Sequence, residues 1–85
     1  MYAITYEKNA LKMLQKMPRN EARRVLQAVE RLASDPRVPG LDVKALRGES
    51  GYRLRVGDWR VLYELLEDRL IVWVLDIGAR GGIYS

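Results

Sequence analysis

The 85-residue chain contains no cysteine and no histidine. Without cysteine it can form no disulfide, no thiolate metal site and no cysteine nucleophile, which fits a reducing, cytoplasmic compartment. Without histidine it can form neither a Ser-His-Asp triad nor a histidine general base. The carboxylates are scattered without metal-ligand spacing, so we expect neither a metal nor a cofactor.

Long apolar runs are also missing. The longest, residues 70–75, has the length of a strand and falls far short of the roughly 20 residues of a membrane helix. The first twelve residues lack the basic start and apolar segment of a signal peptide. We therefore expect one domain over residues 1–85, with no membrane contact.

Positive charge is in modest excess. Fifteen Lys and Arg residues against eleven Asp and Glu residues give a net charge of +4, which suggests an anionic partner. Residues 1–50 hold the whole excess, because residues 51–85 carry five charges of each sign. A basic surface in the second half must therefore arise from the placement of individual residues.

The first half of the chain shows strand and then helix periodicity. Residues 2–6 alternate between apolar and small or polar side chains, which predicts a short strand. Residues 7–17 and 22–33 carry apolar stripes with a helical period, and Pro18 separates them. Residues 35–51 are rich in proline, glycine and charge, which predicts a connecting loop.

The second half shows the period of two that is typical of strands. Residues 52–56 and 59–65 predict a hairpin joined by Gly57 and Asp58, and residues 70–77 predict a central strand. The order β-α-α-β-β-β predicts a two-layer α+β domain. In this domain a helical hairpin covers one face of an antiparallel sheet.

The two-residue turn sets the hairpin register, which places Arg55 opposite Arg60 and Leu54 opposite Val61. The apolar pairs must share the core face, so Arg53, Arg55 and Arg60 share the other face. Like charges directly opposite repel by up to roughly 1 kcal/mol, so this arrangement opposes stability. The face is either a solvated basic surface or a binding surface for phosphate, which the planar arginine fork suits.

Two other groups are candidates for the same partner. Glycines in the tail would allow Arg80 and Tyr84 to turn towards the arginine face, where Tyr84 could stack on a base; alternatively, Tyr84 closes the core. An i, i+4 stripe on the first helix is either a solvated face or a second contact with nucleic acid, and it comprises Lys8, Lys12 and Lys16.

Four segments together resemble the RelE/ParE superfamily of type II toxins, and more narrowly its RelE branch. They are KALRG at 44–48, GYRLRVGDWRVLY at 51–63, IGAR at 77–80 and IY at 83–84. The resemblance covers the whole chain and implies a RelE-like fold. It also implies a ribosome-dependent endoribonuclease that cleaves mRNA in the ribosomal A site by attack of the ribose 2′-hydroxyl. The implied partners are the ribosome, mRNA and a cognate antitoxin in a hetero-oligomer.

The resemblance also implies roles for individual residues. By this resemblance, the catalytic residues would be Arg53, Arg55, Arg60, Arg80 and Tyr84. The residues that contact RNA would be Lys44, Arg47 and the three lysines of the first helix. The RelE archetype has lysines where this chain has the first two arginines, and arginine is a poor general base. Many relatives also have a basic residue or histidine at the position of Ala79. The general base therefore stays open between Lys44, Tyr84 and a ribosomal RNA group.

Two other functions remain open on the same fold. A ParE-like toxin would inhibit DNA gyrase and would not need a phosphate-cleaving surface. A non-catalytic RNA-binding domain would use the arginines for binding alone.

Overall fold

The structure is a computed structural model, and it describes residues 1–48 and 50–79. These residues contain two helices and five strands. In chain order they are β1 (Ala3–Tyr6), α1 (Lys8–Lys16), α2 (Arg19–Ser34), β2 (Asp42–Ala45), β3 (Tyr52–Val56), β4 (Trp59–Leu66) and β5 (Ile71–Ala79). The predicted α+β class and the helical hairpin are confirmed.

The sheet has the strand order β1-β5-β4-β3-β2 and is mixed. The pairs β2–β3, β3–β4 and β4–β5 are antiparallel as predicted, but β1 pairs with β5 in parallel. The prediction of a wholly antiparallel sheet is wrong at this edge. A parallel pair needs a long connection, which the two helices and three further strands supply.

Strand β2 lies inside the segment that was predicted to be a loop. Its four residues alternate, with Val43 half-buried while Asp42 and Lys44 are exposed. It pairs with β3, and the Leu46 amide donates to the Gly51 carbonyl oxygen at 3.1 Å to close the connection. The loop prediction is therefore wrong for these four residues, because this pairing satisfies their backbone groups.

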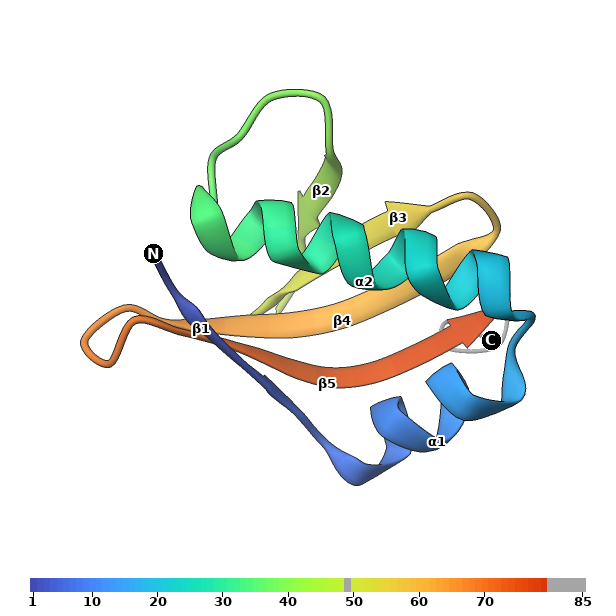
Figure 1. Cartoon of the computed structure of the whole chain (residues 1–85). Helices are drawn as coiled ribbons and strands as arrows, with labels where there is room; N and C mark the ends of the chain where they lie inside the picture. Colours follow the sequence, from blue (N-terminus) through green and yellow to red (C-terminus); the bar gives the residue numbers. More distant parts are fainter. Residues whose placement is uncertain (49, 80–85) are drawn as a thin grey trace.

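Both helices cover the same face of the sheet (Figure 1). The stripe predicted for α2 is buried at Val25, Val29 and Leu32, where it meets Leu54 and Val61 of the sheet. α1 lies along β5 and adds Ala10 to the core. The other face of the sheet has no helix of the described chain over it.

The predicted hairpin register is confirmed. Val56 lies opposite Trp59, and Arg55 lies opposite Arg60. Gly57 has a φ of 60°, which suits glycine at the first loop position of a two-residue hairpin turn. Because the turn has two residues, the arginines of β3 and β4 must point to the same face.

A bulge in β5 explains why its apolar run does not alternate. Leu62 pairs with Asp76 while Tyr63 pairs with Val74, so Leu75 has no partner on β4. The extra residue lets both Val74 and Ile77 face the core although they are three positions apart. Beyond the bulge, Gly78 lies opposite Arg60 and adds no side chain to the outer face.

Candidate nucleic-acid interface

The outer face of β3 and β4 carries the three arginines that the register predicted. Leu54 and Val61 are fully buried on the helix side, so their strand neighbours Arg53, Arg55 and Arg60 face away from the core. We call these three residues the arginine surface. It lies on the face of the sheet that the helices leave uncovered.

The neighbouring arginines of β3 differ in their surroundings. The Arg53 side chain is only 14% exposed, and its Nη2 donates to Oδ1 of Asp42 at 2.9 Å. Its Nε is buried and has no hydrogen-bond partner among the described residues. Arg55 is exposed and forms no ion pair with them. Arg53 is therefore held against the sheet, whereas Arg55 is accessible to an oxyanion.

Asp42 is the residue of this surface that the sequence analysis missed. It lies opposite Arg55 in the β2–β3 register while its carboxylate bonds diagonally to Arg53. This negative charge beside Arg53 and Arg55 weakens the like-charge repulsion expected between Arg55 and Arg60. The alternation of residues 41–44 (Leu, Asp, Val, Lys) was the available signal for this strand.

Of the other predicted contact residues, the structure brings Lys44 to this surface and separates the α1 lysines from it. Lys44 is exposed and lies opposite Arg53, and Arg47 is exposed in the β2–β3 connection. The lysines of α1 are exposed but belong to the helical layer, on the other side of the sheet; they are Lys8, Lys12 and Lys16. The predicted residues Arg80 and Tyr84 lie outside the described residues.

The chemistry of the surface is that of fixed positive charge. Arginine stays protonated at physiological pH, so these side chains can bind a phosphate and stabilise added negative charge, but they cannot accept a proton. Within residues 1–48 and 50–79 there is no group of three or more carboxylates that could hold a metal ion. Over the same residues, no helix is long and apolar enough to span a bilayer.

A cationic sheet face that no described helix covers suits an anionic partner, and comparison with known families identifies the class of protein as a toxin. The family model described as "ParE toxin of type II toxin-antitoxin system, parDE" matches residues 4–84. A protein of Methanocaldococcus jannaschii that bears the name RelE1 is 31% identical over 87 residues, which is 99% of this chain and 96% of that protein. The chain belongs to the RelE/ParE superfamily of type II toxins.

Solved structures confirm the RelE-like fold. The archaeal RelE–RelB complex from Pyrococcus horikoshii contains a chain that is 30% identical with a TM-score of 0.82, covering 95% of this chain and 97% of that one. The RelBE2 complex of Mycobacterium tuberculosis gives 26% identity and a TM-score of 0.79, with coverages of 93% and 98%. The isolated Escherichia coli RelE toxin, at 21% identity and a TM-score of 0.78 with coverages of 100% and 93%, supports the fold alone.

Proposed function

We propose that this toxin is an endoribonuclease that cleaves mRNA in the ribosomal A site. The observation that carries the proposal is the arginine surface, in which Arg55 lies directly opposite Arg60 on an uncovered sheet face. Like charges directly opposite each other on a sheet repel. A phosphate bound between the two guanidinium groups would relieve that repulsion, which supports phosphate binding at this pair.

The proposed reaction is an internal transfer at phosphorus. The ribose 2′-oxygen forms a bond to the adjacent phosphorus and loses its proton, while the bond from phosphorus to the 5′-oxygen breaks and that oxygen gains a proton. The products are a 2′,3′-cyclic phosphate and a 5′-hydroxyl. Arg55 and Arg60 stabilise the extra negative charge on the five-coordinate phosphorus, and Arg53 fixes the neighbouring phosphate.

The proton transfers need groups other than these arginines. In the described part of the chain, Lys44 is exposed beside Arg53 and remains a candidate proton acceptor. Tyr84 and a ribosomal RNA group are the other candidates, and Arg80 is proposed to add a further positive charge. Catalysis would otherwise depend on orientation and electrostatic stabilisation.

The proposal includes a cognate antitoxin. Relatives of this chain were solved as complexes of RelE with RelB. We propose that an antitoxin forms a hetero-oligomer with this toxin and neutralises it by covering the arginine surface. The ribosome as target implies that the toxin acts in the cytoplasm.

Primer extension on translating ribosomes tests the proposed reaction. Wild-type protein should introduce new 5′ ends within ribosome-bound message, and Arg60→Ala should slow cleavage by about 100-fold, the usual effect of removing one donor to a transition-state oxyanion. Arg69→Ala is the matched control, because Arg69 is exposed in the β4–β5 connection and lies outside the arginine surface. Intact message in the presence of folded wild-type protein would contradict the proposal.

Gyrase inhibition is the second candidate, since the matching family model carries the ParE name. A DNA supercoiling assay separates the two functions. Inhibition of gyrase together with intact message would favour the ParE-like function, whereas cleaved message with unaffected supercoiling would favour the endoribonuclease.

A further inference from the structure

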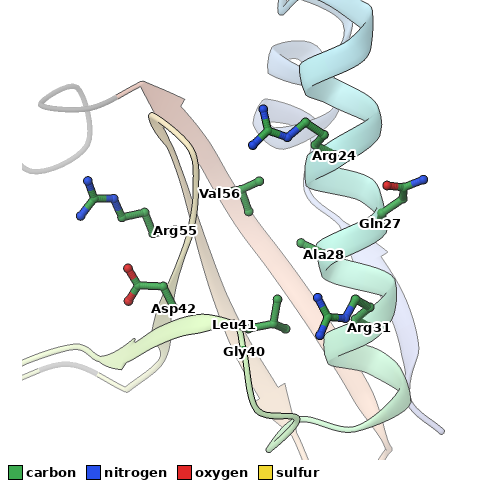
Figure 2. A pocket seen from close by; sticks show the side chains of 9 residues that line it. All are labelled: Arg24, Gln27, Ala28, Arg31, Gly40, Leu41, Asp42, Arg55 and Val56. Carbon is green, nitrogen blue, oxygen red and sulfur yellow. The ribbon is translucent and has the colours of Figure 1, made fainter.

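A cleft of about 330 Å³ separates α2 from the β2–β3 edge of the sheet (Figure 2). Its volume is at the lower end of the range for ligand pockets in proteins. Arg24 and Arg31 line it from the helix, and its floor is apolar, formed by Ala28, Leu41 and Val56. The contacts predicted from the sequence include neither of these two arginines, although Arg55 of the arginine surface also lines the cleft.

Both arginine side chains reach from the helix towards the connections beside the sheet. Nη2 of Arg31 lies near Gly40 in the α2–β2 connection, 3.6 Å from where a Cβ would be at that glycine, and Nη2 of Arg24 lies near Gly57 in the β3–β4 turn, 3.8 Å from where a Cβ would be there. Figure 2 shows the two guanidinium groups pointing from α2 towards the sheet edge, one on each side of Ala28. Two positive charges therefore flank one apolar floor.

No carboxylate of the described residues neutralises these two charges. Arg31 donates only a long hydrogen bond of 3.5 Å to the Pro39 carbonyl oxygen, and neither arginine forms an ion pair with a described residue. Asp42 also lines the cleft, but its carboxylate points away from α2 and bonds to Arg53. The cleft thus presents unneutralised guanidinium groups to an anion.

The cleft and the arginine surface meet at the edge of β3. Pairing between β2 and β3 ends at Asp42 and Arg55, so Val56 lies beyond the last pair and the edge of β3 is open there. Val56 lines the cleft, while the guanidinium of its neighbour Arg55 points away from α2 (Figure 2). A chain bound to Arg55 can therefore pass this edge and enter the cleft.

We propose that the cleft binds a nucleotide of RNA, continuous with the segment that lies on the arginine surface. Arg24 and Arg31 bind its flanking phosphates, and the apolar floor packs against its ribose or base. This inference rests on the proposed function, because it extends the RNA path from the sheet to α2. The planar guanidinium fork matches two phosphate oxygens, which favours RNA over an acidic protein segment as the occupant.

Salt-dependent binding of an uncleavable RNA tests the inference. The probe is a labelled single-stranded 2′-O-methyl RNA of about 12 nucleotides, which lacks the attacking hydroxyl and is long enough to reach both sites. Fluorescence anisotropy gives its affinity between about 50 and 200 mM salt. Arg24→Gln combined with Arg31→Gln should weaken binding about tenfold and reduce the slope of log K against log salt by about 1.4, the loss of two single-strand phosphate contacts.

The matched control is Arg19→Gln combined with Arg23→Gln, which removes the same charge from exposed positions of α2 outside the cleft. This control should keep the wild-type slope. Equal slopes for the two double variants would overturn the inference while leaving cleavage of ribosome-bound message, and hence the proposed function, intact. If wild-type protein does not bind this RNA, the inference is overturned, whereas the proposed function is decided separately by cleavage of ribosome-bound message. Poly-L-glutamate serves as a second probe. If the Arg24→Gln and Arg31→Gln double variant loses binding to poly-L-glutamate but keeps the wild-type salt slope for RNA, the cleft binds an acidic protein segment and the inference is overturned.

Discussion

Arg53 and Arg55 are two positions apart on one strand, yet their neighbours give them different properties. Arg53 lies between Lys44 on β2 and Leu62 on β4, and the Asp42 carboxylate holds its largely buried side chain. A charge with so little exposure needs a counter-ion, because desolvation otherwise opposes it. Arg55 has no such restraint among the described residues and remains exposed. We therefore expect the exposed Arg55 to contact the reacting phosphate, and Arg53, held in place by Asp42, to bind the neighbouring phosphate.

Asp42→Asn should strengthen RNA binding. The substitution removes the Asp42 carboxylate, which bonds to Arg53, lies opposite Arg55 and competes with phosphate for both. The dissociation constant for the 2′-O-methyl RNA should fall about two- to fivefold at low salt, the size of one ion pair near the protein surface, and the effect should fade at high salt.

Asp68→Asn is the control for net charge, because Asp68 is exposed in the β4–β5 connection. It should change the affinity less than Asp42→Asn does. Weaker binding by Asp42→Asn would contradict competition and would show that Asp42 positions Arg53 for RNA.

At the scale of elements, the β4–β5 connection contains a strained residue. Leu70 has a φ of 54°, in the left-handed region that non-glycine residues rarely adopt. Its carbonyl oxygen accepts a hydrogen bond from the Ala3 amide at 2.8 Å, so this conformation helps to align β1 beside β5. Its side chain is 51% exposed, which leaves little packing to offset the strain.

Leu70→Asn should stabilise the fold by about 1 kcal/mol, because asparagine tolerates the left-handed conformation better than leucine does. Urea denaturation measures the change in the free energy of unfolding. Leu26→Asn is the control, since Leu26 is an exposed leucine within α2, where asparagine has the lower helix propensity. This control should lower stability. An unchanged or lower stability of Leu70→Asn would show that the leucine side chain matters more than the backbone strain.

At the scale of the whole molecule, two tyrosines couple stability to alkaline pH. Burial, with a smaller contribution from Tyr52, raises the pKa of Tyr63 to about 12. Burial, with a smaller contribution from Glu30, likewise raises the pKa of Tyr6 to about 12. Both rings pack in or against the core, so their hydroxyl groups keep their protons in the folded protein when those of the unfolded chain are lost.

The free energy of unfolding should therefore be constant below about pH 10 as far as these tyrosines are concerned, and should fall as the pH rises from about 10 towards 12. The sign follows because the unfolded chain binds fewer protons than the folded protein in this range. Thermal unfolding measured across the pH series gives the effect. Tyr63→Phe should make the fall shallower, and an equally steep fall in this variant would exclude Tyr63 as its source.

The sequence by itself determined the features that depend on local patterns. The 3.6-residue stripes defined both helices, and the two-residue turn at Gly57 and Asp58 defined the hairpin register. From the register alone it followed that Arg53, Arg55 and Arg60 share one face, because side chains alternate strictly along a strand. The motifs of residues 44–63 and 77–84 indicated the toxin superfamily to which the chain belongs.

Only the tertiary structure decided the features that depend on contacts between distant segments. The parallel pairing of β1 with β5 and the existence of β2 depend on which strand edges meet, and a four-residue alternation is too short to reveal this. The same pairing brings Asp42 to Arg53 and so distinguishes the held arginine from the exposed Arg55. The approach of α2 to the sheet edge likewise creates the cleft at Arg24 and Arg31. Local periodicity defines the face of a side chain, but its burial and its partners come from strands and helices that are remote in the chain.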